Sequence, residues 1–157
     1  MSFHASIVAL KDFSPKRAAE LFPEWRVTDT ETDFFSAIRY DFGALFAIGS
    51  VSEWTILAGR DLGNVPEATA RKLLQYADGG WYYLCGVASI YALLIVSDGV
   101  PIRQWFRDQS SERVFGFDSR PLGFSEDFVF SQLKKLAHLS HSDLAAISFR
   151  CVESTVA

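Results

Sequence analysis

The fold of this chain is decided by residues 81–106, which read WYYLCGVASIYALLIVSDGVPIRQWF. The first sixteen residues of this stretch are mostly apolar or aromatic, and Ser97-Asp98-Gly99 then interrupts them before an alternating segment begins. An aspartate-glycine pair between two strand-like runs predicts a tight hairpin turn, because glycine adopts the positive φ that such turns require. We therefore expect residues 81–106 to form the central hairpin of an antiparallel sheet.

A turn or bulge at residues 86–89 is predicted to divide residues 81–85 from residues 90–96. Residues 90–96 contain no charged side chain, and Tyr91 is the only one of them with a polar tip. We therefore expect residues 90–96 to form a central strand that is covered on both faces.

The strand after the Asp98-Gly99 turn sorts its side chains onto two faces. Alternation places on one face Val100, Ile102, Gln104 and Phe106. The other face carries Pro101, Arg103, Trp105 and Arg107. Pro101 cannot donate a hydrogen bond to a neighbouring strand, which favours the edge of a sheet or the start of a strand.

Two main helices are predicted outside this stretch. Residues 70, 73, 74 and 77 are apolar and share one helix face, and Asn64 with Glu67 can form a capping box ahead of them. The sequence Asp78-Gly79-Gly80 is predicted to stop this helix. A second helix begins after Ser125, where Phe124 and Val129 can form a hydrophobic staple.

These patterns predict a single α+β domain spanning residues 1–157, a length that allows one sizeable core. We expect a mostly antiparallel sheet of five to seven strands. Two main helices, at about residues 66–78 and 126–138, are expected to pack on one face of this sheet.

Composition and charge exclude several classes of protein. Hydrophobic residues make up 49% of the chain, which excludes a disordered protein. The formal net charge is -4, which argues against a nucleic-acid-binding domain, because such domains usually carry a basic stripe. A basic protein partner is electrostatically compatible with this acidic chain.

The chain shows no sign of export or of a membrane span. Its N-terminus lacks a basic segment followed by an apolar core and a cleavage site, and its longest apolar run, residues 81–96, is shorter than the ~20 residues that span a bilayer. We expect a soluble cytoplasmic protein. One disulfide between Cys85 and Cys151 is conceivable, but a buried free thiol is favoured for Cys85 because it lies within an apolar run.

No residue cluster carries a recognisable catalytic or cofactor motif. His138, His141 and Asp143 resemble metal-ligand spacing, but a predicted cap at Ser140 separates the two histidines and no third histidine lies nearby. His4 is isolated, and Cys85 lacks the electropositive, partly exposed setting that activates a thiol. Neither a GxxxxGK[ST] nor a GxGxxG pattern occurs. We therefore predict no catalytic residue, no metal and no cofactor.

The face that carries Trp105 is the candidate functional surface, with two interpretations open. If Val100, Ile102 and Phe106 point into the core, Trp105 emerges between two arginines, a composition favoured at interface hot spots. In the other interpretation a helix covers Trp105 and the arginine side chains extend outwards over it. The candidate partner-binding residues are Glu53, Asp61, Arg103, Trp105, Arg107, Asp108 and Glu112.

Part of the chain resembles a known family of proteins. The residues that carry the resemblance are Trp54-Thr55-Ile56-Leu57, a helix, an apolar hairpin closed by Asp98-Gly99, then Arg103 and Pro121-Leu122. This pattern is similar to small bacterial immunity proteins that accompany polymorphic toxins, including those delivered by type VI and contact-dependent secretion. The resemblance implies a non-enzymatic protein that binds one cognate toxin and blocks its active site. The acidic balance suits a basic toxin, such as a nuclease.

Two alternatives to the immunity function stay open. The first is a small enzyme or ligand-binding domain with a pocket between sheet and helices, in which Cys85, His138 or His141 takes part. The second is an adaptor or chaperone for a secreted protein.

Overall fold

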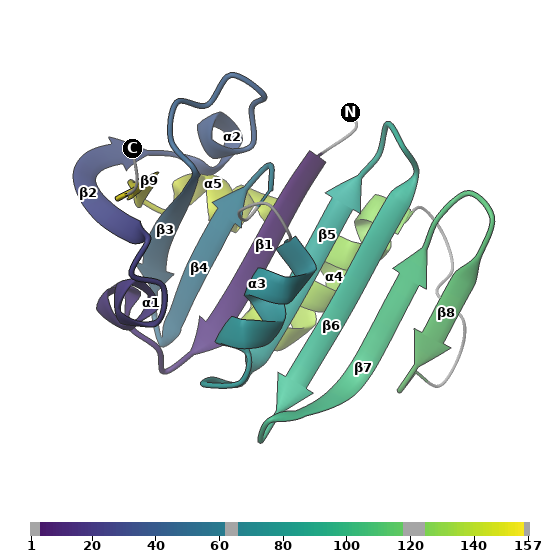
Figure 1. Cartoon of the computed structure of the whole chain (residues 1–157). Coiled ribbons are helices and arrows are strands. Elements are labelled where there is room, and N and C mark those ends of the chain that lie inside the picture. The colour runs from purple at the N-terminus through teal and green to yellow at the C-terminus, as the bar shows by residue number, and fades with distance from the viewer. Residues whose placement is uncertain (1–3, 62–65, 118–124, 156–157) are drawn as a thin grey trace.

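The computed structural model describes residues 4–61, 66–117 and 125–155. Its strands are β1 (His4–Lys11), β2 (Trp25–Thr32), β3 (Phe46–Val51), β4 (Trp54–Gly59), β5 (Gly79–Cys85), β6 (Ile90–Ser97), β7 (Val100–Arg107), β8 (Glu112–Phe115) and β9 (Phe149–Ser154). They form one nine-stranded sheet in the order β2-β9-β3-β4-β1-β5-β6-β7-β8 (Figure 1). Every pair of neighbouring strands is antiparallel.

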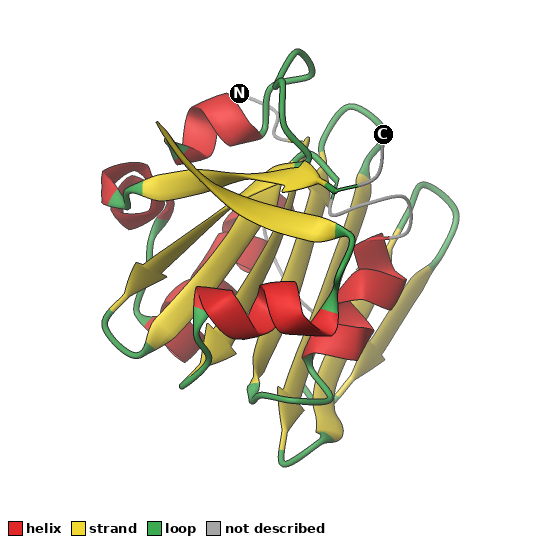
Figure 2. Cartoon of the chain, turned by 60° about the vertical axis from the view of Figure 1, so that its left-hand side comes forward, coloured by secondary structure: helices red, strands yellow, loops and turns green. Residues whose placement is uncertain are grey.

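Helices cover both faces of the sheet (Figures 1 and 2). The face turned toward the viewer in Figure 1, which we call the front face, holds α1 (Pro15–Leu21) and α3 (Pro66–Leu73). The opposite, back face holds α2 (Phe34–Ala37), α4 (Ser125–Ala137) and α5 (His141–Ala146). Within the described ranges, no helix is long and apolar enough to cross a membrane.

The predicted arrangement of five to seven strands with two main helices on one face is wrong. The sheet has nine strands, and the two predicted helices correspond to α3 and α4, which lie on opposite faces. The physical reason is visible in β1, the middle strand. Ile7 packs in the back core and Val8 in the front core, and both are fully buried. A strand that is apolar on both sides needs a covering layer on each side.

The turns predicted around residues 81–106 are confirmed. Asp98 and Gly99 have φ values of 52° and 75°, as a two-residue hairpin turn requires, and they join β6 to β7. The backbone N–H of Ser89 donates to the carbonyl of Gly86 over 3.2 Å in the turn between β5 and β6. The hairpin stretch therefore supplies three neighbouring strands of one half of the sheet.

Gly79 is the first residue of β5 and is needed for strand packing rather than for ending a helix. A Cβ atom at this position would lie 1.9 Å from the carbonyl oxygen of Ala9 on the neighbouring β1. Only glycine therefore allows β5 to approach β1 this closely. The helix itself ends earlier than predicted, at Leu73.

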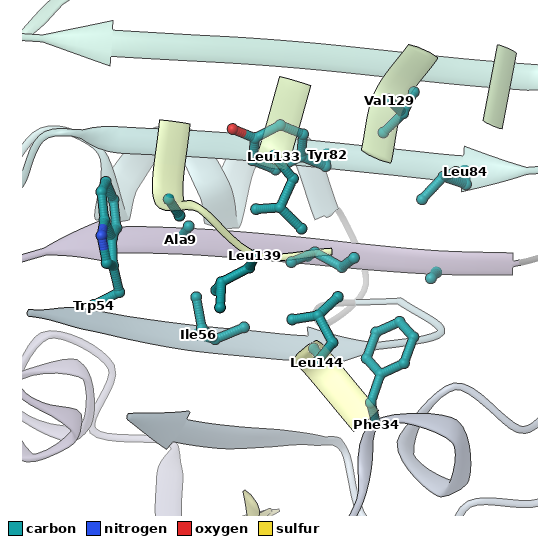
Figure 3. Packing of buried hydrophobic residues seen from close by; sticks show 14 of the residues in the cluster. Ala9, Phe34, Trp54, Ile56, Tyr82, Leu84, Val129, Leu133, Leu139 and Leu144 are labelled. Carbon is teal, nitrogen blue, oxygen red and sulfur yellow. The ribbon is translucent and has the colours of Figure 1, made fainter. Parts of the chain in front are cut away.

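The back core extends across both halves of the sheet. Figure 3 shows Val129 and Leu133 of α4 packing on Tyr82 and Leu84 of β5, with Leu144 of α5 farther along the same face. Gln132 is also buried on α4. This layer reaches β7, where Trp105 belongs to the same core.

Some predicted features lie outside the described residues. These are the cap at Asn64, the Phe124 side of the hydrophobic staple, and the Pro121-Leu122 element of the resemblance. The cap at Ser140 is confirmed, because its hydroxyl accepts from the N–H of Asp143 and the Asp143 carboxylate accepts from the N–H of Ser140. These hydrogen bonds lower the pKa of Asp143.

Candidate functional site

The candidate site lies on the front face of β5–β8, beyond α3. Antiparallel register aligns two rows of side chains across these four strands. One row is Tyr83, Ala92, Phe106 and Arg113. The other row is Trp81, Leu94, Gln104 and Phe115. We call these eight residues the open face, because β6, β7 and β8 have no helix in front of them in the described structure (Figure 1).

The open face forms the floor and walls of a groove of about 420 Å³. Glu67 and Arg71 of α3 border it on one side, and Arg113 and Phe115 of β8 border it on the other. Each row begins and ends with a large side chain, whereas Ala92 and Leu94 of β6 lie between them. The groove is therefore hollow in the middle because β6 contributes smaller side chains than its neighbours.

Aromatic rings give the groove fixed walls. Trp81 donates from its indole Nε1 to the Ser6 hydroxyl over 2.9 Å, and its ring stacks on Tyr83 with 6.0 Å between centroids. On the other wall, the guanidinium of Arg113 lies 4.9 Å from the centroid of the Phe106 ring. Phe115 is 58% exposed at the rim. Exposed aromatic groups beside an arginine have the composition of a protein interface.

One end of the groove is polar. The Nε2 atom of His4 lies 3.4 Å from Asp61 Oδ1 and also 3.4 Å from the Tyr83 hydroxyl. Cys85 pairs with His4 in the β1–β5 register. Burial, with a smaller contribution from Cys85 and Asp61, raises the pKa of Tyr83 to about 12. Tyr83 is therefore a neutral hydrogen-bonding group at neutral pH.

Trp105 follows the second of the two open interpretations. It is 1% exposed on the back face, where its ring meets Phe128 of α4 edge-on at 4.9 Å. Its indole Nε1 donates to Glu112 Oε2 over 3.2 Å. The expectation that Trp105 emerges at the surface is wrong, because α4 covers the back face and leaves the Phe106 side of β7 open. No partner can reach this indole without displacing α4.

Three other candidate residues near Trp105 take part in local structure. The Arg103 guanidinium lies 5.7 Å from the Phe117 ring centroid, and Arg107 Nη1 donates to the Ser125 hydroxyl over 3.2 Å. Asp108 Oδ1 accepts from the backbone N–H groups of the two serines that follow in the β7–β8 turn, and these bonds lower the Asp108 pKa. Their role as partner contacts stays a prediction.

The two remaining acidic candidates, Asp61 and Glu53, lie in different places. Asp61 lines the groove beside the open face. Glu53 lies in the β3–β4 turn and lines a second, separate cavity together with His138 and Asp143. The seven candidates therefore do not form a single surface.

The groove residues themselves were missed from the sequence. Phe106 was placed in the core in one of the two open interpretations, because alternation predicts that the two faces of a strand differ but does not predict which face is covered. Arg113 and Phe115 could have indicated a surface strand, since a short strand that carries arginine and phenylalanine two positions apart is unlike a core strand. Trp81 and Tyr83 gave none, because they sit in a continuous apolar run.

The residues considered for chemistry are not brought together. Cys85 lies on the front face, whereas His138 and His141 flank the junction of α4 and α5 on the back face. In the described part of the chain, no group of three or more His, Cys, Asp or Glu side chains could hold a metal ion. Cys85 and Cys151 are both free and buried, which confirms the expectation for Cys85. Burial also raises the pKa of Cys151.

Comparisons with known proteins add no further identification. No protein-family model matches the chain, and neither a curated protein nor a solved structure shows significant similarity to it.

Proposed function

We propose that the protein binds a partner protein through the open face, and that this partner is a bacterial toxin that it neutralises. The observation that carries the proposal is the apolar groove between α3 and β8, in front of which the described residues place no helix. Single exposed apolar residues are normal on any protein, but a contiguous, ring-walled patch marks an interaction site. The neutralising role rests on the resemblance to immunity proteins and extends the binding role.

Further exposed apolar side chains lie next to the groove on β7. Val100 is 58% exposed and Ile102 is 45% exposed. They lie outside the groove lining, near the β6–β7 turn of the strand that carries Phe106. A partner that covers the groove and this end of β7 would bury aromatic and branched side chains at its centre, as hot-spot regions do.

The proposed place of action is the cytoplasm. Cys85 and Cys151 are free thiols that form no disulfide. Free buried thiols fit a reducing compartment, where protein disulfides are rare. An immunity protein in the cytoplasm meets any toxin that enters the cell or is made there.

The test is co-expression with the product of each adjacent gene. We expect one such product to be toxic alone, to lose its toxicity in the presence of this protein, and to purify with it as a stoichiometric complex. Phe115→Asp should abolish both effects. Tyr40→Asp is the matched control, because Tyr40 is also aromatic and exposed (84%) but lies outside the groove. A failure of every neighbour to form a complex would refute the proposal.

The same experiment separates the chaperone alternative. A chaperone or adaptor also forms a complex with its client, but its deletion stops export of the client. An immunity protein leaves export intact and abolishes toxicity. Secretion and survival are therefore scored in the same strains.

One observation favours a second candidate function, a small-ligand-binding domain. A volume of about 420 Å³ lies within the range of ligand pockets, and the lining is apolar with a few polar groups. Native mass spectrometry of the freshly purified protein tests this candidate. A retained small molecule that is lost in Ala92→Leu would support ligand binding over toxin neutralisation.

A further inference from the structure

The charged side chains around the groove differ in whether they have a partner of opposite charge. Glu67 Oε1 lies 3.0 Å from the guanidinium of Arg71, one turn away on α3, and Asp61 contacts His4. Arg113 is different, because no carboxylate of the described residues makes an ion pair with it. Its contact is with the face of the Phe106 ring. The β8 end of the groove therefore presents a positive charge that is available to a ligand.

The shape of the groove selects a flat apolar group beside that charge. Trp81 and Tyr83 form one wall, and Phe106 with Phe115 forms the other. The floor between them is Ala92 and Leu94, which leave room for a ring. Aromatic rings prefer to meet other rings in stacked or edge-on contacts, so an inserted ring gains contacts on both walls.

We infer that the groove binds a partner segment that presents an aromatic side chain next to a carboxylate, with the ring between the two aromatic walls and the carboxylate on Arg113. This inference rests on the proposed function, because the partner protein supplies the segment. Arginine suits this role, since its planar guanidinium can donate two parallel hydrogen bonds to one carboxylate.

The local charge and the net charge of the chain point to different features of the partner. The formal net charge of -4 favours a basic partner over long distances. At the groove, Arg113 would repel an inserted cation. The two nearby carboxylates already have partners, since Asp61 contacts His4 and Glu67 contacts Arg71. A partner with a positive net charge that inserts a neighbouring aromatic residue and carboxylate into the groove fits both the net charge of the chain and the local charge at Arg113. Long-range charge then affects the rate of association and the groove affects specificity.

Three dipeptide probes test the inference directly. They are N-acetyl-Trp-Asp-amide, N-acetyl-Trp-Asn-amide and N-acetyl-Trp-Lys-amide, which share one ring and differ in charge. Each is titrated into ¹⁵N-labelled protein and followed by NMR. We expect shifts at the backbone amides of β6, β7 and β8, with the Asp probe binding about two- to fivefold more tightly than the Asn probe, the range of an exposed ion pair. The Lys probe should bind most weakly.

Arg113→Gln separates the charge from the ring. In this variant the Asp and Asn probes should bind equally, with the affinity that the Asn probe has for the unchanged protein. Arg26→Gln is the control, because Arg26 lies on β2 at the opposite edge of the sheet and should leave all three affinities unchanged. Tighter binding of the Lys probe, equal binding of all three, or no shifts on the open face at millimolar probe would overturn the inference.

Failure of the inference is distinguishable from failure of the proposed function. If the toxin complex forms and Arg113→Gln leaves its affinity unchanged, the inference is wrong and the proposed function stands. If no neighbouring gene product forms a complex but the probes bind in the expected order, the proposed function is wrong. The inference that the groove binds an aromatic group next to a carboxylate then still stands.

Discussion

Trp105 and Phe106 are neighbours in sequence on β7 and point to opposite sides of the strand. The Trp105 side is covered by a helix, whereas the Phe106 side faces the groove. Trp105 is 1% exposed beneath α4, whereas Phe106 faces the groove beneath the guanidinium of Arg113. Both are large aromatic residues with one polar neighbour in sequence, Gln104 for Trp105 and Arg107 for Phe106, so composition does not distinguish them. The position of α4, which comes about twenty residues later in the chain, decides which one is core and which one is surface.

Trp105→Ala should give the largest effect on stability. Removing a fully buried indole leaves a cavity under α4 and removes the partner of Glu112, so we expect a loss of about 3–5 kcal/mol in the free energy of unfolding. Urea denaturation measures this loss. Phe106→Ala is the matched change on the open side and should lose less than half as much. A loss under about 1 kcal/mol for Trp105→Ala would mean that α4 does not cover this residue in solution.

The comparison also shows what the sequence could predict of the fold. Turn chemistry is local, so the hairpin at Asp98-Gly99 and the cap at Ser140 were predicted correctly. The helix arrangement is not local. Nothing in the apolar stripes of α3 and α4 predicts on which face each helix packs, although β1, which is buried on both sides, needs a covering layer on each face.

The candidate site was predictable only in part, for a related reason. Asp61 was among the predicted contact residues, and it borders the groove. The groove itself is made by register, which aligns Tyr83 with Ala92, Phe106 and Arg113 across four strands. Register across these hairpins depends on the loop geometry and on the irregularity between Ile95 and Val96, which the sequence pattern did not indicate, so the small floor residue Ala92 carried no recognisable signal.

The two faces also predict a dependence of stability on alkaline pH, through Tyr82 on the back face and Tyr83 on the front face. Burial raises the pKa of both above the ordinary value near 10, with that of Tyr83 at about 12. The unfolded chain therefore loses these protons first. Their contribution to stability is complete below pH 10; that of Tyr83 is lost as the pH rises through 10 to about 12, and that of Tyr82 continues to fall at higher pH.

Absorbance at 295 nm and urea denaturation between pH 9 and about pH 12 check this dependence. Tyr83 should ionise in the folded protein near pH 12, whereas Tyr82 should ionise only on unfolding. Tyr82→Phe should flatten the decrease of stability with pH. Ionisation of Tyr82 near pH 10 in the folded protein would contradict its burial under α4.

At neutral pH, Tyr82→Phe should have a smaller effect on the free energy of unfolding than Trp105→Ala, and it should increase stability. The Tyr82 hydroxyl is buried and makes no hydrogen bond in the described structure, and its ring lies over Gly80, where a Cβ would be 2.7 Å from the hydroxyl oxygen. Removing an unsatisfied buried hydroxyl relieves a desolvation cost, so we expect about 1 kcal/mol of added stability. Thermal unfolding measures it. A loss of about 1 kcal/mol would instead show that the hydroxyl is hydrogen-bonded in solution.

Phe115→Ser should have the smallest effect on stability and tests the open face directly. Phe115 is 58% exposed on the edge strand β8, so its truncation should change the free energy of unfolding by less than about 0.5 kcal/mol. Binding should respond differently. As part of a groove wall, Phe115 should contribute about 2 kcal/mol to the affinity for the partner, which isothermal titration calorimetry measures as a roughly thirtyfold weaker complex.

Tyr40→Ser is the control for this change, because Tyr40 is still more exposed and lies away from the groove. It should alter neither stability nor affinity. Equal binding by both variants would place the interface elsewhere, whereas a large loss of stability in Phe115→Ser would assign the exposed ring to the structural core of β7 and β8. The contrast between Trp105 and Phe115 then becomes quantitative, because one face changes the free energy of unfolding and the other changes the free energy of binding.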